Sequence, residues 1–72
     1  MIAIVLKDST YKRVLSRLRH DDSIQVFLSL SSRVFHESGS TYLYFETFHD
    51  LCCASDFLSA YNAVYRVAYF CL

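Results

Sequence analysis

The order of local patterns along this 72-residue chain predicts a small α+β domain. Residues 11–18 and 57–64 each place apolar side chains at i, i+3, i+4 and i+7, which is the spacing of one helical face. The runs around them are rich in β-branched and aromatic residues, and the richest, 41–48, is typical of a central strand. A chain of this length has room for one hydrophobic core, so we expect a single domain over residues 1–72.

The first half of the chain contains three predicted elements. Residues 2–7 form a continuous apolar run, which is typical of a strand buried on both sides. Residues 8–10 offer N-cap side chains for the helix that carries Tyr11, Val14, Leu15 and Leu18. From Ile24 the apolar period changes to two, so residues 24–30 predict a second strand, which residues 33–36 extend across a bulge at 31–32.

The second half begins with the turn at residues 37–40, which contains the only glycine and predicts a hairpin into the 41–48 strand. Residues 49–54 are expected to connect this strand to a second helix capped by Ser55 and Asp56. The run from Tyr65 to Leu72 predicts a last strand, and a helix that continues to Phe70 is the alternative. The order is the split βαβ plan of a ferredoxin-like (βαββαβ) two-layer sandwich: a four-stranded antiparallel sheet with two helices on one face, and the first and third strands central.

Composition and charge indicate a contact surface. Hydrophobic residues make up 54% of the chain, more than so small a body can hide, which predicts an exposed patch that contacts a partner or a second copy. The alternative is a dense core with scattered surface tyrosines. Residues 1–20 carry five cations and one acid, and residues 21–72 carry two cations and six acids. This division suits head-to-tail contacts and argues against a general polyanion-binding surface.

Strand parity assigns the side chains on the sheet face that the helices leave open. If Glu46 avoids the helices, then the same face carries aromatic side chains from the second and third strands. A register slip of one residue would reverse the two faces. The predicted partner-binding set is Phe27, Tyr42, Tyr44 and Phe48, with the basic arc of the first helix, Lys12, Arg13, Arg17 and Arg19, contributing electrostatic steering.

The string Tyr44–Phe48 resembles the end of the third-strand signature of RNA recognition motifs, which stack bases on sheet aromatics. The small and basic residues that should precede it are absent, and the first strand has no aromatic residue. The sequence therefore favours a non-catalytic protein–protein interaction module, a regulator, inhibitor or adaptor of the size that viruses and mobile elements encode. An RNA- or DNA-binding domain that uses the basic arc of the first helix is the alternative.

The residues with chemical potential have simpler interpretations. An odd number of cysteines, two of them adjacent, is typical of free thiols in a reducing compartment, so we expect a cytoplasmic protein. His49, Cys52 and Cys53 could supply metal ligands, and Asp8 could serve a nuclease, but capping and core packing explain these residues without chemistry. No signal peptide and no membrane span is expected. We expect no enzyme activity, no metal and no cofactor.

Overall fold

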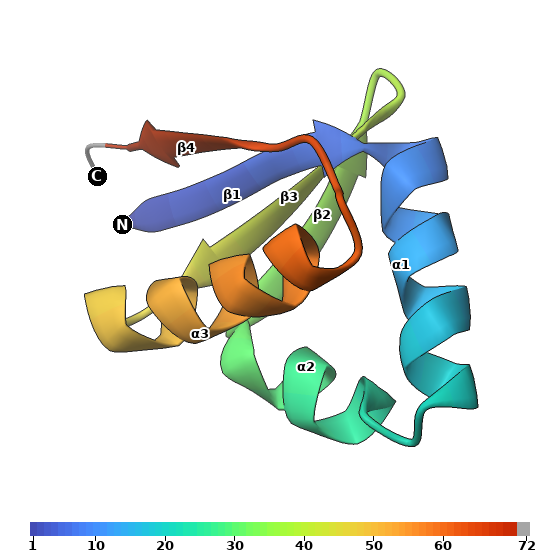
Figure 1. The fold of residues 1–72 in the computed structure, drawn as a ribbon. Coiled ribbons are helices and arrows are strands. Elements are labelled where there is room, and N and C mark those ends of the chain that lie inside the picture. The colour runs from blue at the N-terminus through green and yellow to red at the C-terminus, as the bar shows by residue number, and fades with distance from the viewer. Residues whose placement is uncertain (71–72) are drawn as a thin grey trace.

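The computed structural model describes residues 1–70 and contains four strands and three helices in that range (Figure 1). In chain order they are β1 (Ile2–Lys7), α1 (Asp8–His20), α2 (Ile24–Leu30), β2 (Arg33–Glu37), β3 (Ser40–Phe45), α3 (Phe48–Ala60) and β4 (Arg66–Tyr69). The strands form one antiparallel sheet in the order β2-β3-β1-β4, and the helices gather on one of its faces. The predicted ferredoxin-like two-layer arrangement, with the first and third strands central, is confirmed.

The helix α2 corrects the prediction of a strand over residues 24–30. Apolar side chains recur there at intervals of three residues as well as two, and in the structure the residues three apart share the buried side of a helix. Phe27 is buried, and Ile24 and Leu30 pack against the core on the same side. Val26 is 57% exposed, so the set with period two has no shared buried face. Tertiary packing decided between two patterns that the sequence offers equally.

The helix boundaries also differ from the prediction. The helix α1 begins at Asp8, directly after β1, and no side chain caps it. The helix α3 begins at Phe48 because the Thr47 hydroxyl accepts a hydrogen bond from the Asp50 amide at 3.1 Å. Residues 48–54, expected as a strand end and a connection, are therefore helical. Ser55 and Asp56 lie inside the helix and do not cap it.

The last strand is confirmed over Arg66–Tyr69, and the alternative of a helix that continues to Phe70 is wrong. It pairs antiparallel with β1. Beyond it, the Phe70 amide donates to the Met1 carbonyl at 2.9 Å, and the terminal amine of Met1 donates to the Phe70 carbonyl at 3.0 Å. Residues 71 and 72, which the prediction placed in this strand, lie outside the described range.

The core lies between the sheet and the three helices. Ile4, Leu43 and Phe45 supply its sheet side. The helices contribute Tyr11, Val14, Leu18, Phe27, Leu51, Ala54 and Leu58. The predicted hairpin joins β2 to β3 through Ser38 and Gly39, whose φ angles of 53° and 79° are those of a type I′ turn.

Candidate functional site: the open face of the sheet

The uncovered face of the sheet is built from two central rows of side chains. Across the four strands, from β2 to β4, the first row is Phe35, Tyr42, Val5 and Arg66. The second row is Arg33, Tyr44, Ala3 and Ala68. Directly opposite residues share a face of an antiparallel sheet, and the alternate row, which includes Ile4 and Leu43, is buried under the helices. These two rows therefore point away from the helical layer.

Three aromatic rings contact one another on this face. The rings of Tyr42 and Tyr44 lie nearly parallel, at 16°, with centroids 6.5 Å apart. Phe70 approaches them at 6.4 Å and 5.6 Å. Ala3, opposite Tyr44, and Ala68, opposite Ala3, are small, which leaves room above the sheet for the Phe70 ring. Ala3 lies on this face and has no exposed surface.

The outer surface of this layer remains open. Phe35, which the register places beside Tyr42, is 51% exposed, and Phe70 is 37% exposed. The two tyrosines are half-buried. We call Phe35, Tyr42, Tyr44 and Phe70 the aromatic face. Large apolar surface that no part of the described chain covers is the usual mark of a contact site.

The charges within the two rows are positive, while the exposed Glu46 directly follows β3. Arg33 on β2 and Arg66 on β4 end the two rows, and neither row contains an acidic residue. The next row, at the hairpin end, carries one charge of each sign, Glu37 and Lys7. Within residues 1–70 neither arginine has a carboxylate within 4.0 Å. As far as the described residues go, both guanidinium groups are available to bind an anion.

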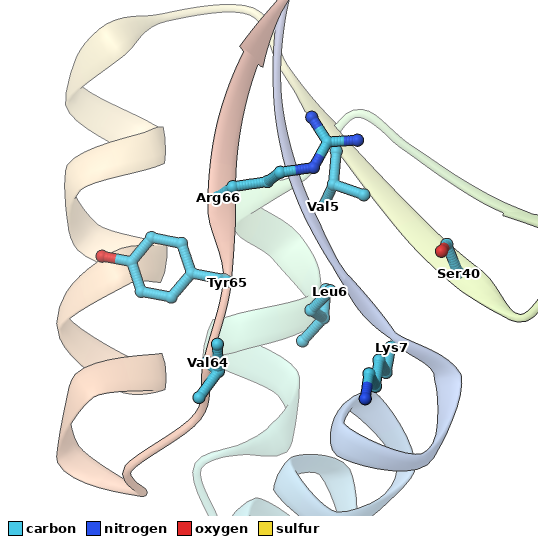
Figure 2. A pocket seen from close by; sticks show the side chains of 7 residues that line it. All are labelled: Val5, Leu6, Lys7, Ser40, Val64, Tyr65 and Arg66. Carbon is cyan, nitrogen blue, oxygen red and sulfur yellow. The ribbon is translucent and has the colours of Figure 1, made fainter.

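A hollow of about 240 Å³ continues the face toward the start of β4 (Figure 2). It is lined by Val5, Leu6, Lys7, Ser40, Val64, Tyr65 and Arg66. Figure 2 shows the Arg66 side chain reaching from β4 toward Val5, whereas the Lys7 ammonium points the other way. The two cations do not converge on one position, so the hollow extends the face without forming a two-cation anion site.

The structure brings together only part of the predicted binding set. Tyr42 and Tyr44 lie on the open face, as parity predicted. Placing Phe27 there was wrong: it is 3% exposed, and its ring meets that of Phe57 edge-on at 5.7 Å. Phe48 is exposed, but it starts α3 and does not belong to the sheet.

The basic arc of α1 is a separate surface. Lys12, Arg13, Arg17 and Arg19 are all exposed. Arg13 is engaged locally, because its Nη1 donates to the Tyr61 carbonyl at 2.9 Å. Since α1 belongs to the helical layer, the arc and the aromatic face lie on different sides of the sheet.

Sequence reasoning missed Phe35, Phe70 and both arginines of the face. The signal for the residues of β2 was present in the hairpin. A two-residue turn at Ser38 and Gly39 fixes the register, and that register sets Phe35 opposite Tyr42 and Arg33 opposite Tyr44. The prediction of one strand over residues 24–36 placed Phe27, and not Phe35, on the open face.

A polar cluster closes the other side of the sheet near the hairpin. The buried Thr41 hydroxyl donates to Asp8 Oδ1 at 2.5 Å, and His36 Nδ1 lies 3.0 Å from Thr41 Oγ1 and 3.2 Å from Asp8 Oδ1. The hydrogen bond from Thr41, and then that from His36, lowers the pKa of Asp8 below its ordinary value. The Thr41 hydroxyl has no exposed surface and is inaccessible as a nucleophile. The cluster has a structural role, because its hydrogen bonds join Asp8 of α1 to the two strands of the hairpin.

The thiols offer a weaker arrangement. Cys53 Sγ lies 3.7 Å from His49 Nε2, one turn away on α3. Cys52 is free and partly buried. Among residues 1–70, no group of three or more His, Cys, Asp or Glu side chains could hold a metal ion. A thiol and an imidazole alone do not define a site.

Comparisons with protein-family models, with curated proteins and with solved structures give no match. In the described part of the chain, none of the helices has the length and apolar character needed to cross a membrane. The case for function therefore depends on the geometry and charge of the open sheet face.

Proposed function

We propose that the protein is a non-catalytic binding module that docks its aromatic face on another macromolecule. The observation that supports this is the layer of aromatic rings on the sheet face opposite the helices, which no other element of the described chain covers. Aromatic side chains bury much area at little cost in rotamer entropy, which suits them to contact surfaces. Such a module acts as a regulator, inhibitor or adaptor by occupying its partner.

Self-association through the same face is the second form of this proposal, and the charges weigh against it. Two copies packed face to face would place Arg33 and Arg66 of each in one interface, with no carboxylate in those rows to pair them. Desolvating unpaired cations is costly. A different molecule with negative charge meets no such penalty, so we favour a heterologous partner over a second copy.

The test compares two exposed apolar side chains on opposite sides of the molecule. Phe35 on β2 and Val26 on α2 are 51% and 57% exposed, so replacing either with serine should leave the core intact. Each variant, immobilised, is incubated with an extract of the cells from which the sequence comes. Nuclease and protease treatment of the retained material then show whether it is nucleic acid or protein.

We expect Val26→Ser to retain the same macromolecule as the unmodified protein and Phe35→Ser to lose it. Equal retention by all three proteins would overturn the proposal, as would loss by Val26→Ser alone. Light scattering on the purified protein addresses the second form: a dimer that Phe35→Ser dissociates would assign the face to a second copy.

A further inference from the structure

We infer that the partner of the aromatic face is a single-stranded nucleic acid. This deepens the proposed function and depends on it, because it names the class of molecule that the same face binds. Three features of the face support the inference: the exposed rings, the two arginines, and the absence of acidic side chains in the rows that contain them.

The rings suit unpaired bases. Phe35 and Phe70 are each more than one third exposed, and Phe70 packs against both tyrosines, so the platform spans the sheet from β2 to the end of β4. Unpaired bases can stack on aromatic side chains, and a comparable sheet platform accepts about two or three bases. In a duplex the base faces are already stacked on one another, so the face should discriminate against double strands.

The arginines suit the phosphates. Arg33 and Arg66 lie on the two outer strands, in neighbouring rows that are two residues apart along each strand. From standard strand spacings their Cα atoms are about 16 Å apart. A strand laid across the rings would therefore meet a guanidinium group from each of the two outer strands. Guanidinium groups bind phosphate through paired hydrogen bonds and also stack on bases.

Charge complementarity separates this partner from the others. A second copy would present the same two cations. An acidic protein segment would satisfy the cations, but carboxylate side chains have no planar ring to place on the aromatic platform. A single strand supplies planar bases and one negative charge per nucleotide, and it matches both features of the face.

The experiment measures binding of fluorescein-labelled oligouridylate and oligothymidylate of about 12 residues, within the usual site sizes of single-strand binders, by fluorescence anisotropy. A duplex of the same length and a labelled oligoglutamate serve as comparison probes. With so few phosphate contacts we expect a Kd in the range of about 10⁻⁴ to 10⁻⁶ M. The slope of log K against log salt should be about −0.7 for each phosphate neutralised.

Three sets of variants locate the site. Phe35→Leu keeps apolar bulk but loses the ring and should weaken binding about 5- to 100-fold, whereas Phe35→Tyr should retain it. Arg33→Gln and Arg66→Gln should each weaken binding and make the salt slope shallower by about 0.7. Arg19→Gln, an exposed arginine of α1, is the matched control and should change neither. Circular dichroism confirms that each variant is folded.

The possible failures can be told apart. If neither oligonucleotide binds while Phe35→Ser still loses its macromolecule from the extract, the inference is overturned and the proposed function stands. Oligoglutamate that binds as tightly as the oligonucleotides identifies an acidic protein segment and also overturns it. Binding that is lost in Arg19→Gln and kept in Arg33→Gln assigns nucleic acid to the basic arc, and the aromatic face then loses this partner.

Discussion

Replacing each of two phenylalanines with alanine gives the most direct test of which aromatic residues form the core. Phe27 is 3% exposed between the helices and the sheet, and Phe35 is half exposed on the opposite face. The sequence pattern placed Phe27 outward, so the two variants distinguish the structure from the simpler strand interpretation.

The expected costs differ several-fold. Truncating a buried phenylalanine costs about 3–5 kcal/mol, from lost transfer energy and the cavity left behind. Phe27→Ala also removes the edge-to-face contact with Phe57. Phe35→Ala removes at most about half of a buried ring, or about 1 kcal/mol. A domain of this size has a total stability of only about 4–11 kcal/mol, so the first change is large and the second is small.

Thermal and urea unfolding followed by circular dichroism measure both. Each kcal/mol shifts the Tm of a domain of this size by about 4–8 °C, so Phe27→Ala should lower it by more than about 12 °C and Phe35→Ala by less than about 8 °C. A Phe27→Ala protein already unfolded in water agrees with the structure. Equal shifts, or a larger shift for Phe35→Ala, would refute this assignment of core and surface.

Three further substitutions probe the hairpin and the polar contacts. Gly39→Ala should lower the free energy of unfolding by about 1–2 kcal/mol in urea titrations, because an alanine at φ 79° is in the strained left-handed region. A steric clash does not contribute, since nothing lies within 4 Å of the new methyl group. Thr41→Val should cost about 0.5–1.5 kcal/mol and flatten the acid limb of the stability–pH curve. The lowered pKa of Asp8 gives stability that is present above its unfolded pKa of about 3.9 and lost as pH falls through the folded value. Tyr61→Phe should flatten the alkaline limb, because the Tyr61 hydroxyl donates to Asp21, which raises the pKa of Tyr61. The stability that this hydrogen bond gives is present below about pH 10, and it is lost as the pH rises through the pKa of Tyr61 in the folded protein. If the free energy of unfolding fell equally with pH in the wild type and in Tyr61→Phe, the role of this contact would be contradicted.

The sequence predicts the strand order and the first helix better than it predicts α2 and the start of α3. The β-rich run at 41–48, the apolar run at 2–7 and the glycine turn each have one reasonable interpretation, and together they specify the order with β3 and β1 central. Residues 24–30 have two interpretations, since their apolar side chains fit a period of two and an interval of three. The choice depends on whether Phe27 finds a buried partner, and that partner, Phe57, is 30 positions away in the chain.

The candidate site was half predictable for a related reason. Parity within one strand places Tyr42 and Tyr44 correctly because a central strand with one covered face admits only two assignments. Phe70 required knowledge that β4 pairs with β1, and that Ala3 and Ala68 leave space for its ring. Such pairings join residues nearly 70 positions apart, and no local pattern encodes them.

The same aromatic richness therefore serves two layers, and the alanines show how the outer layer is kept open. On the covered face, the central strand β1 presents Ile4 and Leu6 to the helices, and large side chains fill the interior. On the open face it presents Val5 and the small Ala3, and the rings of Tyr42, Tyr44 and Phe70 contact one another on that face. Two rings of the open face, those of Phe35 and Phe70, are more than one third exposed, and each lies on or next to an outer strand that carries an arginine. This combination of exposed rings and positive charge supports the proposed single-stranded nucleic-acid partner.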